Sequence, residues 1–306
     1  FQAEDGIRDV ERSRGLGDVY KRQSGGSPSK ISGSASSSFI DEVEKILGGE
    51  FLLFSHLNIQ CNQFPDWHYD YVHRVRMSLN IHSLSASFSD DVDPKCIWEL
   101  SRFEWATKLA RAWNLTGEDK YLQRLNSLSV DWLNNNPPNQ GVNWYCAQEC
   151  SIRLINLLLC NDMVDQQGSV AKFNTLVEAH CQRIQSTTGY GRSQNNNHGI
   201  TEAAALFIGG IWLKENVGNC EEYARFILVS RSILLERVSK LILQYGGFSQ
   251  YSTNYHRLLM DTLVQVEAWR AKLAIEPFPI DYYERIRLAL GWLKSVCEPK
   301  NGLTPN

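Results

Sequence analysis

Four short stretches of this 306-residue chain gather side chains that can transfer protons or hold an anion. Histidine and tyrosine exchange protons, amide groups donate hydrogen bonds to developing negative charge, and arginine binds a carboxylate through two parallel hydrogen bonds. These candidate stretches run from Asp93 to Arg102, from Gly141 to Arg153, from Asn195 to Glu202 and from Gly246 to His256.

Each stretch also has an ordinary structural explanation. Glu99 and Arg102 are three residues apart, and Glu149 and Arg153 are four apart. Both are spacings at which side chains on one helix pair with each other. The asparagine run of the third stretch suits a loop that caps a helix. Its histidine, and the Tyr-His pair of the fourth stretch, suit core or helix-face positions when each is taken alone.

The elements that must position these side chains are predicted to be helices. Apolar residues recur at three- and four-residue steps between Lys95 and Trp113, and Asp93-Pro94 opens this run with a cap and a first-turn proline. Further helices are expected at 119–133, 145–162, 169–186, 198–215, 220–243, 253–273 and 280–296. For 39–92 we expect irregular structure plus a helix or two.

Successive helical hairpins indicate a solenoid or a closed toroid. Strict sequence repeats are not visible, which disfavours modular arrays such as tetratricopeptide repeats. The four candidate stretches fall at loop-to-helix junctions, and in a toroid those junctions converge on one cleft. Taken together, the stretches therefore favour a common site.

At this point the sequence resembles a known family. Four motifs of the helical domain of heparinase II/III lyases have counterparts here, at the family's spacing, from about Phe51 to the end of the chain. The counterparts are Asp93-Pro94-Lys95 with Trp98-Glu99-Leu100-Ser101-Arg102; Asn143-Trp144 with Glu149, Arg153 and Asn156; Asn196-Asn197-His198 with Glu202; and Tyr255-His256.

The resemblance implies β-elimination on a uronic-acid polysaccharide, with no cofactor and no metal. The uronate carboxylate must be neutralised, the proton at C5 removed and the leaving oxygen protonated. The family pattern gives the first task to Asn197, with His198 beside it, and the proton transfers to Tyr255. Tyrosine needs a nearby cation or hydrogen-bond donor to act as a base at neutral pH, which His256, Arg257 or His198 could supply. The expected substrate-binding residues are Arg102, Asn143, Trp144, Glu149, Asn196 and His256.

The resemblance also implies a fold class, all-α, as an incomplete (α/α) toroid of helical hairpins that covers residues 39–300. Residues 301–306 resemble the link to the family's C-terminal β-sandwich, which the sequence lacks. Family members use a histidine from that sandwich, so we expect this fragment to be weakly active or inactive alone. Its partners would be the acidic polysaccharide and that sandwich.

Two other functions remain open. An α/α-toroid glycoside hydrolase would need two carboxylates across the scissile bond, and Glu99, Glu149 and Glu202 are the candidates. A non-catalytic protein on the same fold would bind acidic glycans without turnover. The sequence does not distinguish heparan sulfate, hyaluronan, alginate-like chains or a bacterial capsule as the substrate, nor endo from exo cleavage.

Composition excludes some classes. The net charge of −3 argues against a nucleic-acid binder and, weakly, against a surface for densely sulfated glycans. No apolar run approaches the ~20 residues of a membrane span. The eight cysteines form no Cys-x-x-Cys pair, which disfavours zinc or thioredoxin-type sites. Their number leans toward a cytoplasmic location, whereas the family implies a periplasmic or secreted one, so localisation stays open.

The first residues suggest an artefact of sequencing. Residues 2–9 and 15–23 match translations of two sequencing adapters in the right order, so 1–23 are expected to be adapter-derived rather than natural. A natural charged tail is the alternative. Residues 24–38, rich in Ser and Gly, are expected to be a flexible lead-in.

Overall fold

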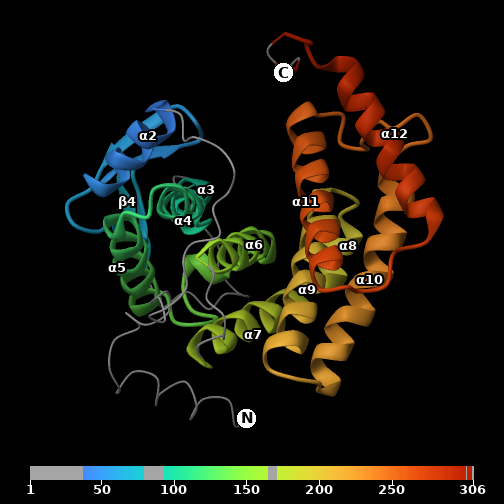
Figure 1. Ribbon diagram of the computed structural model, residues 1–306, viewed down its shortest axis with the longest axis horizontal. Coiled ribbons are helices and arrows are strands. Elements are labelled where there is room, and N and C mark those ends of the chain that lie inside the picture. Colours follow the sequence, from blue (N-terminus) through green and yellow to red (C-terminus); the bar gives the residue numbers. More distant parts are fainter. Residues whose placement is uncertain (1–36, 79–92, 165–170, 301, 305–306) are drawn as a thin grey trace. The chain divides into compact units, whose positions relative to one another are not determined.

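The computed structural model describes residues 37–78, 93–164, 171–300 and 302–304 (Figure 1). The chain divides into two compact units. The N-terminal unit comprises residues 1–149 and 156–176, and the C-terminal unit comprises 150–155 and 177–306. The predicted adapter segment and nearly all of the predicted lead-in lie outside the described residues. Among the helices that are described, none has the length and apolar character to cross a membrane.

The N-terminal unit begins with a helix and two β-hairpins. Strands β1 and β2 pair antiparallel, with Glu50 opposite Gln60 and Leu53 opposite Leu57, and β3 pairs antiparallel with β4. The prediction of irregular structure with a helix or two for 39–92 missed these short strands. The elements are α2 (Ser37–Leu47), β1 (Glu50–Leu53), β2 (Leu57–Gln60), β3 (Tyr69–Asp70) and β4 (Val75–Arg76).

The predicted single helix over 95–113 is wrong, because the structure breaks it into α3 (Lys95–Ser101) and α4 (Glu104–Thr116). Phe103 adopts a left-handed conformation with φ 66° and is fully buried. Its ring lies 4.7 Å from that of Trp105 and 5.1 Å from that of Trp132, centroid to centroid. Left-handed backbone costs about 1–2 kcal/mol, and burying a phenylalanine returns about 1.5–3 kcal/mol, so the aromatic cluster stabilises the break.

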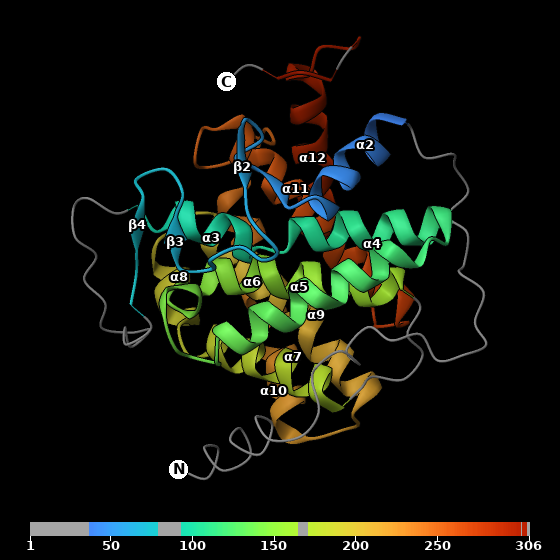
Figure 2. The same cartoon turned by 90° about the vertical axis from the view of Figure 1, so that its left-hand side faces the viewer.

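Helix α4 turns into α5 (Asp119–Asn135) through Gly117, which takes φ 73° and donates its amide to the carbonyl of Trp113. Only glycine adopts that cap without strain. The two helices pack side by side (Figure 2). The 3₁₀ helix η3 (Val142–Trp144) follows and packs on α3, where the indole of Trp98 donates to the carbonyl of Val142.

Helices α6 (Ala147–Met163) and α7 (Ala171–Gln185) follow, and each has residues in both units. In the C-terminal unit, the guanidinium of Arg153 on α6 donates to Nε2 of His180 on α7 at 3.0 Å. Both side chains are buried. The family counterpart Arg153 therefore contacts α7.

The C-terminal unit is organised around α9. This helix packs against α8, α10 and α11, and α12 packs against α10 and α11 (Figure 1). Every residue from Gly199 to Leu213 is buried, the pattern of a helix that is covered all round. Gly209 and Gly210 let neighbours approach closely, since a Cβ on Gly210 would lie 3.0 Å from Ile227. The elements are α8 (Thr188–Ser193), α9 (Asn197–Asn216), α10 (Glu221–Leu241), α11 (Thr253–Lys272) and α12 (Ile280–Val296).

Candidate active site

The asparagine run forms the start of α9. Asn195 takes a left-handed conformation with φ 52°, and the side chain of Asn196 caps the helix by accepting from the amide of His198 at 3.0 Å. Asn197 is the first helical residue and is mostly buried, while His198 is part-exposed. A helix N-terminus carries positive partial charge and binds anions. Predicted residues Asn196, Asn197 and His198 therefore lie together where a carboxylate would be favoured.

A buried carboxylate lies one turn below His198. Oε1 of Glu202 is 3.5 Å from Nδ1 of His198, and the side chain of Glu202 is 4% exposed. Burial raises the pKa of Glu202, and His198 only partly opposes this shift. Oε2 has no hydrogen-bond partner among the described residues, and it lies against Gly191 of α8. Glu202 is thus placed to orient the imidazole of His198.

Tyr255 and His256 lie in the first turn of α11, whose N-cap is Ser252. Tyr255 is 44% exposed. His256 is fully buried, with Nε2 2.9 Å from the carbonyl oxygen of Ala289 and its ring stacked on Trp292 at 4.6 Å. Burial lowers the pKa of His256. Tyr255 is therefore accessible to a ligand, whereas His256 packs against α12.

Two residues that the sequence did not single out hold these segments. The side chain of Gln250 accepts from the amide of Asn197 at 2.8 Å, which links the segment before Tyr255 to the start of α9. Arg237 of α10 is buried and donates to the carbonyl of Arg192 and to the side chain of Asn195, both at 2.9 Å. Gln250 falls within the fourth stretch, but no spacing signal marks Arg237.

In the N-terminal unit, Arg102 is held by two carboxylates. Nε and Nη2 donate to the two oxygens of Glu149 at 2.7 and 3.0 Å, and Nη1 pairs with Glu99. Burial alone would lower the pKa of Arg102, but Glu149 and Glu99 outweigh it and raise the pKa. Asn156 donates to the carbonyl of Arg102 at 2.8 Å. Arg102 pairs with Glu99 as the helix spacing indicates, and a substrate carboxylate would have to compete with both glutamates.

Asn143 and Trp144 are fully buried within the N-terminal unit. The amide of Asn143 donates to the carbonyl of Trp67 and to the side chain of Asn136, both at 2.8 Å. The indole of Trp144 donates to the carbonyl of Asn136 at 3.1 Å. These contacts support η3, and the substrate-binding role of both residues stays a prediction.

The family model described as heparinase II/III N-terminus matches residues 46–305 of this sequence. The chain belongs to the heparinase II/III family. The heparin-sulfate lyase of Bacteroides thetaiotaomicron is 24% identical over 198 residues, which cover 62% of this chain and 28% of that protein. The predicted family resemblance is therefore confirmed.

Solved structures show the same fold. The match to heparinase III covers 97% of this chain and 44% of the heparinase III chain, with a TM-score of 0.61. The match to the heparan sulfate lyase of Pedobacter heparinus covers 98% of this chain and 44% of that chain, with a TM-score of 0.60. Sequence identity is 17% for both, so the likeness concerns the fold alone. The predicted class, all-α hairpins of an incomplete (α/α) toroid, is confirmed. This heparinase II/III chain spans less than half of either solved lyase.

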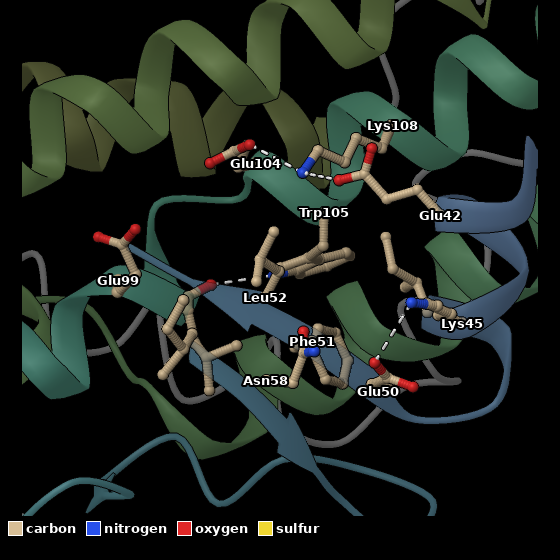
Figure 3. A pocket seen from close by; sticks show the side chains of 13 residues that line it. Glu42, Lys45, Glu50, Phe51, Leu52, Asn58, Glu99, Glu104, Trp105 and Lys108 are labelled. Atoms are coloured by element: carbon tan, nitrogen blue, oxygen red, sulfur yellow. Dashed lines mark hydrogen bonds and ion pairs between the residues drawn. The ribbon is translucent and has the colours of Figure 1, made fainter. Parts of the chain in front are cut away.

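A pocket of the N-terminal unit is lined by Glu99 but by none of the predicted catalytic or substrate-binding residues (Figure 3). Its walls come from α2, β1, β2, α3 and α4, and Arg102 is not among its lining residues. At one edge of the pocket, Lys108 pairs with Glu42 of α2 at 2.7 Å and with Glu104 of its own helix at 2.9 Å (Figure 3). Because the single positive charge of Lys108 faces two carboxylates, these three residues together favour no anionic ligand.

Proposed function

We propose that this heparinase II/III chain is the helical part of a polysaccharide lyase that cleaves a uronic-acid polysaccharide by β-elimination. The observation that carries the proposal is the start of α9. Asn197 and His198 lie at a helix N-terminus, and Gln250 ties that terminus to the segment that leads to Tyr255. The family relation adds the reaction class.

The residues fit the steps of the elimination. The amide of Asn197, together with the positive end of α9, would stabilise the negative charge that develops on the uronate carboxylate as C5 loses its proton. Tyr255 would take that proton, the C4–O bond would break, and a C4–C5 double bond would remain. Tyr255 or its neighbours would return a proton to the leaving oxygen. Positioned groups of this kind contribute about 10²–10⁴-fold each.

Of the three groups that could activate Tyr255, His256 is engaged elsewhere. Its ring bonds to Ala289 and stacks on Trp292. We therefore favour His198, with Glu202 as its orienting partner, while Arg257 remains the alternative.

The test uses the complete protein, recovered from its gene without residues 1–23, on a panel of acidic polysaccharides. The first substrate is heparan sulfate, because that glycan is named for the solved relative from Pedobacter heparinus. Ultraviolet absorbance of unsaturated uronate is expected with the original protein and not with Tyr255→Phe. The matched control is Tyr251→Phe, which changes an 86% exposed tyrosine four residues earlier and should keep its activity.

The other outcomes decide between functions. Saturated reducing ends without absorbance would make the protein a hydrolase. Glycan binding without any product would make it a binding protein. Activity of Tyr255→Phe equal to that of the control would refute the assigned base.

A further inference from the structure

A mixed cluster of possible metal ligands lies in the N-terminal unit, outside the candidate active site. Asp70 ends β3, His73 lies in the turn between β3 and β4, and Cys96 lies in the first turn of α3. One ligand atom of each residue lies within 4.8 Å of those of the other two. Carboxylate oxygen, imidazole nitrogen and thiolate sulfur are all ligands of zinc.

Asp70 is fixed in place before any ion binds. It is fully buried, and its Oδ1 accepts from the backbone amides of Val72 at 2.8 Å and His73 at 3.0 Å. Its Oδ2 faces Nδ1 of His73 at 2.7 Å. Outer hydrogen bonds of this type orient ligating carboxylates and tune their metals. One oxygen is thus held by the backbone while the other points to the cluster.

Cys96 supplies a sulfur in an enclosed position. It is 7% exposed, and burial raises the pKa of its thiol to about 11, with the carboxylates of Asp70 and Asp93 adding to the shift. The sulfur binds a metal as the thiolate, so binding of a divalent cation releases the thiol proton.

We propose that Asp70, His73 and Cys96 bind one zinc ion. Two ligands about 2.05 Å from a tetrahedral ion lie ~3.3 Å apart, so Oδ2 and Nδ1 need to separate by little more than half an ångström from their 2.7 Å. The ion forms bonds to oxygen, nitrogen and sulfur, and the thiol proton passes to solvent. A water molecule completes the fourth position.

The proposed ion would join the β3–β4 hairpin to α3. Glu99 belongs to α3, and Arg102 directly follows it. The ion would therefore stabilise the segment that carries the Arg102–Glu99 pair. The proposal does not depend on the lyase function, because the site lies on residues that the reaction does not use.

The experiment measures metal binding by the full 306-residue chain, reduced and freed of metal by chelation. Zinc titration followed by dialysis is expected to leave one zinc per chain and to raise the melting temperature. Cobalt(II) is expected to give the ultraviolet charge-transfer absorption of a thiolate–cobalt bond. Cys96→Ser, His73→Gln and Asp70→Asn should each weaken zinc by more than the ~10–100-fold that outer-shell partners are worth.

Matched controls change the same residue types elsewhere. His56→Gln alters an exposed histidine of the β1–β2 turn, and Cys220→Ser removes an exposed cysteine, so neither should change zinc affinity. Equal zinc binding by the original chain and by all three cluster variants would mean adventitious zinc only and would overturn the proposal. So would cobalt bound without thiolate absorption, a result that needs no variant to fold.

Discussion

Two glycines of α8 allow a direct test of the packing beneath the candidate active site. Gly189 and Gly191 lie in the same short helix, two residues apart. A Cβ on Gly189 would meet no atom within 4 Å, whereas a Cβ on Gly191 would collide with the carboxylate of Glu202. Gly189→Ala therefore adds a methyl group in open space, whereas Gly191→Ala adds one where the Glu202 carboxylate already lies.

The expected difference follows from two opposing effects. Replacing a helical glycine by alanine stabilises by about 0.5–1 kcal/mol, and both variants gain this amount. Only Gly191→Ala must displace a buried side chain, and overpacking a core costs about 1–3 kcal/mol. The second variant should thus be less stable than the first by about 1–3 kcal/mol, at roughly 2–4 °C of melting temperature per kcal/mol for a unit of this size.

The measurement is thermal unfolding followed by far-ultraviolet circular dichroism. Both variants are also made in a Glu202→Ala background, where the carboxylate is gone and Gly191→Ala should no longer carry a penalty. Equal melting temperatures of the two single variants would show that Glu202 does not fill the space beside Gly191. A penalty that persists without the carboxylate would assign the clash to another neighbour.

Three further predictions concern the same side chains. Burial raises the pKa of Glu202, so its contribution to stability is full below the ordinary glutamate pKa and is lost as the pH rises through the raised value. The melting temperature of Glu202→Gln should therefore increase relative to that of the unsubstituted protein as the pH rises. A difference in melting temperature that does not change with pH would contradict this. Arg102→Lys should lower the free energy of unfolding, because lysine cannot bond to both oxygens of Glu149. The expected loss is about 2 kcal/mol, the contribution of one hydrogen bond between charged groups. An unchanged midpoint of urea unfolding would refute this prediction. Gln250→Ala should lower turnover of the complete protein at least ~10-fold by releasing the amide of Asn197. Its melting temperature should change only slightly. Unchanged turnover would exclude a positioning role for Gln250.

The sequence predicted most helices because their apolar periodicity is long and their ends carry Gly, Asn or Pro signals. Helix α12 agrees with its predicted range of 280–296, and α11 differs by one residue at its end. The break at Phe103 was missed because neither glycine nor proline marks it. A left-handed phenylalanine is stabilised by tertiary contacts with Trp105 and Trp132, which local periodicity does not contain.

For the candidate site too, the sequence indicated which residues to consider but not the tertiary contacts around them. The family resemblance indicated Asn197, His198 and Tyr255, and the structure places Asn197 and His198 at the start of α9. The environment of each group was not readable from the sequence. Nothing local distinguishes exposed Tyr255 from buried His256 beside it, or indicates that Arg237, about forty residues away in the chain, holds Asn195.

The burial of α9 has a consequence for motion. Amides from Gly199 to Leu213 are covered on every side, so hydrogen exchange there should require near-global opening of the C-terminal unit. Asn197 and His198 lie at the N-terminal end of this slowly exchanging helix. Tyr255 follows a part-exposed segment in which Tyr251 is 86% exposed, so the amides of that segment should exchange earlier than those of α9. Adjustment to differently shaped ligands would then come from the tyrosine side, while the asparagine and histidine stay fixed.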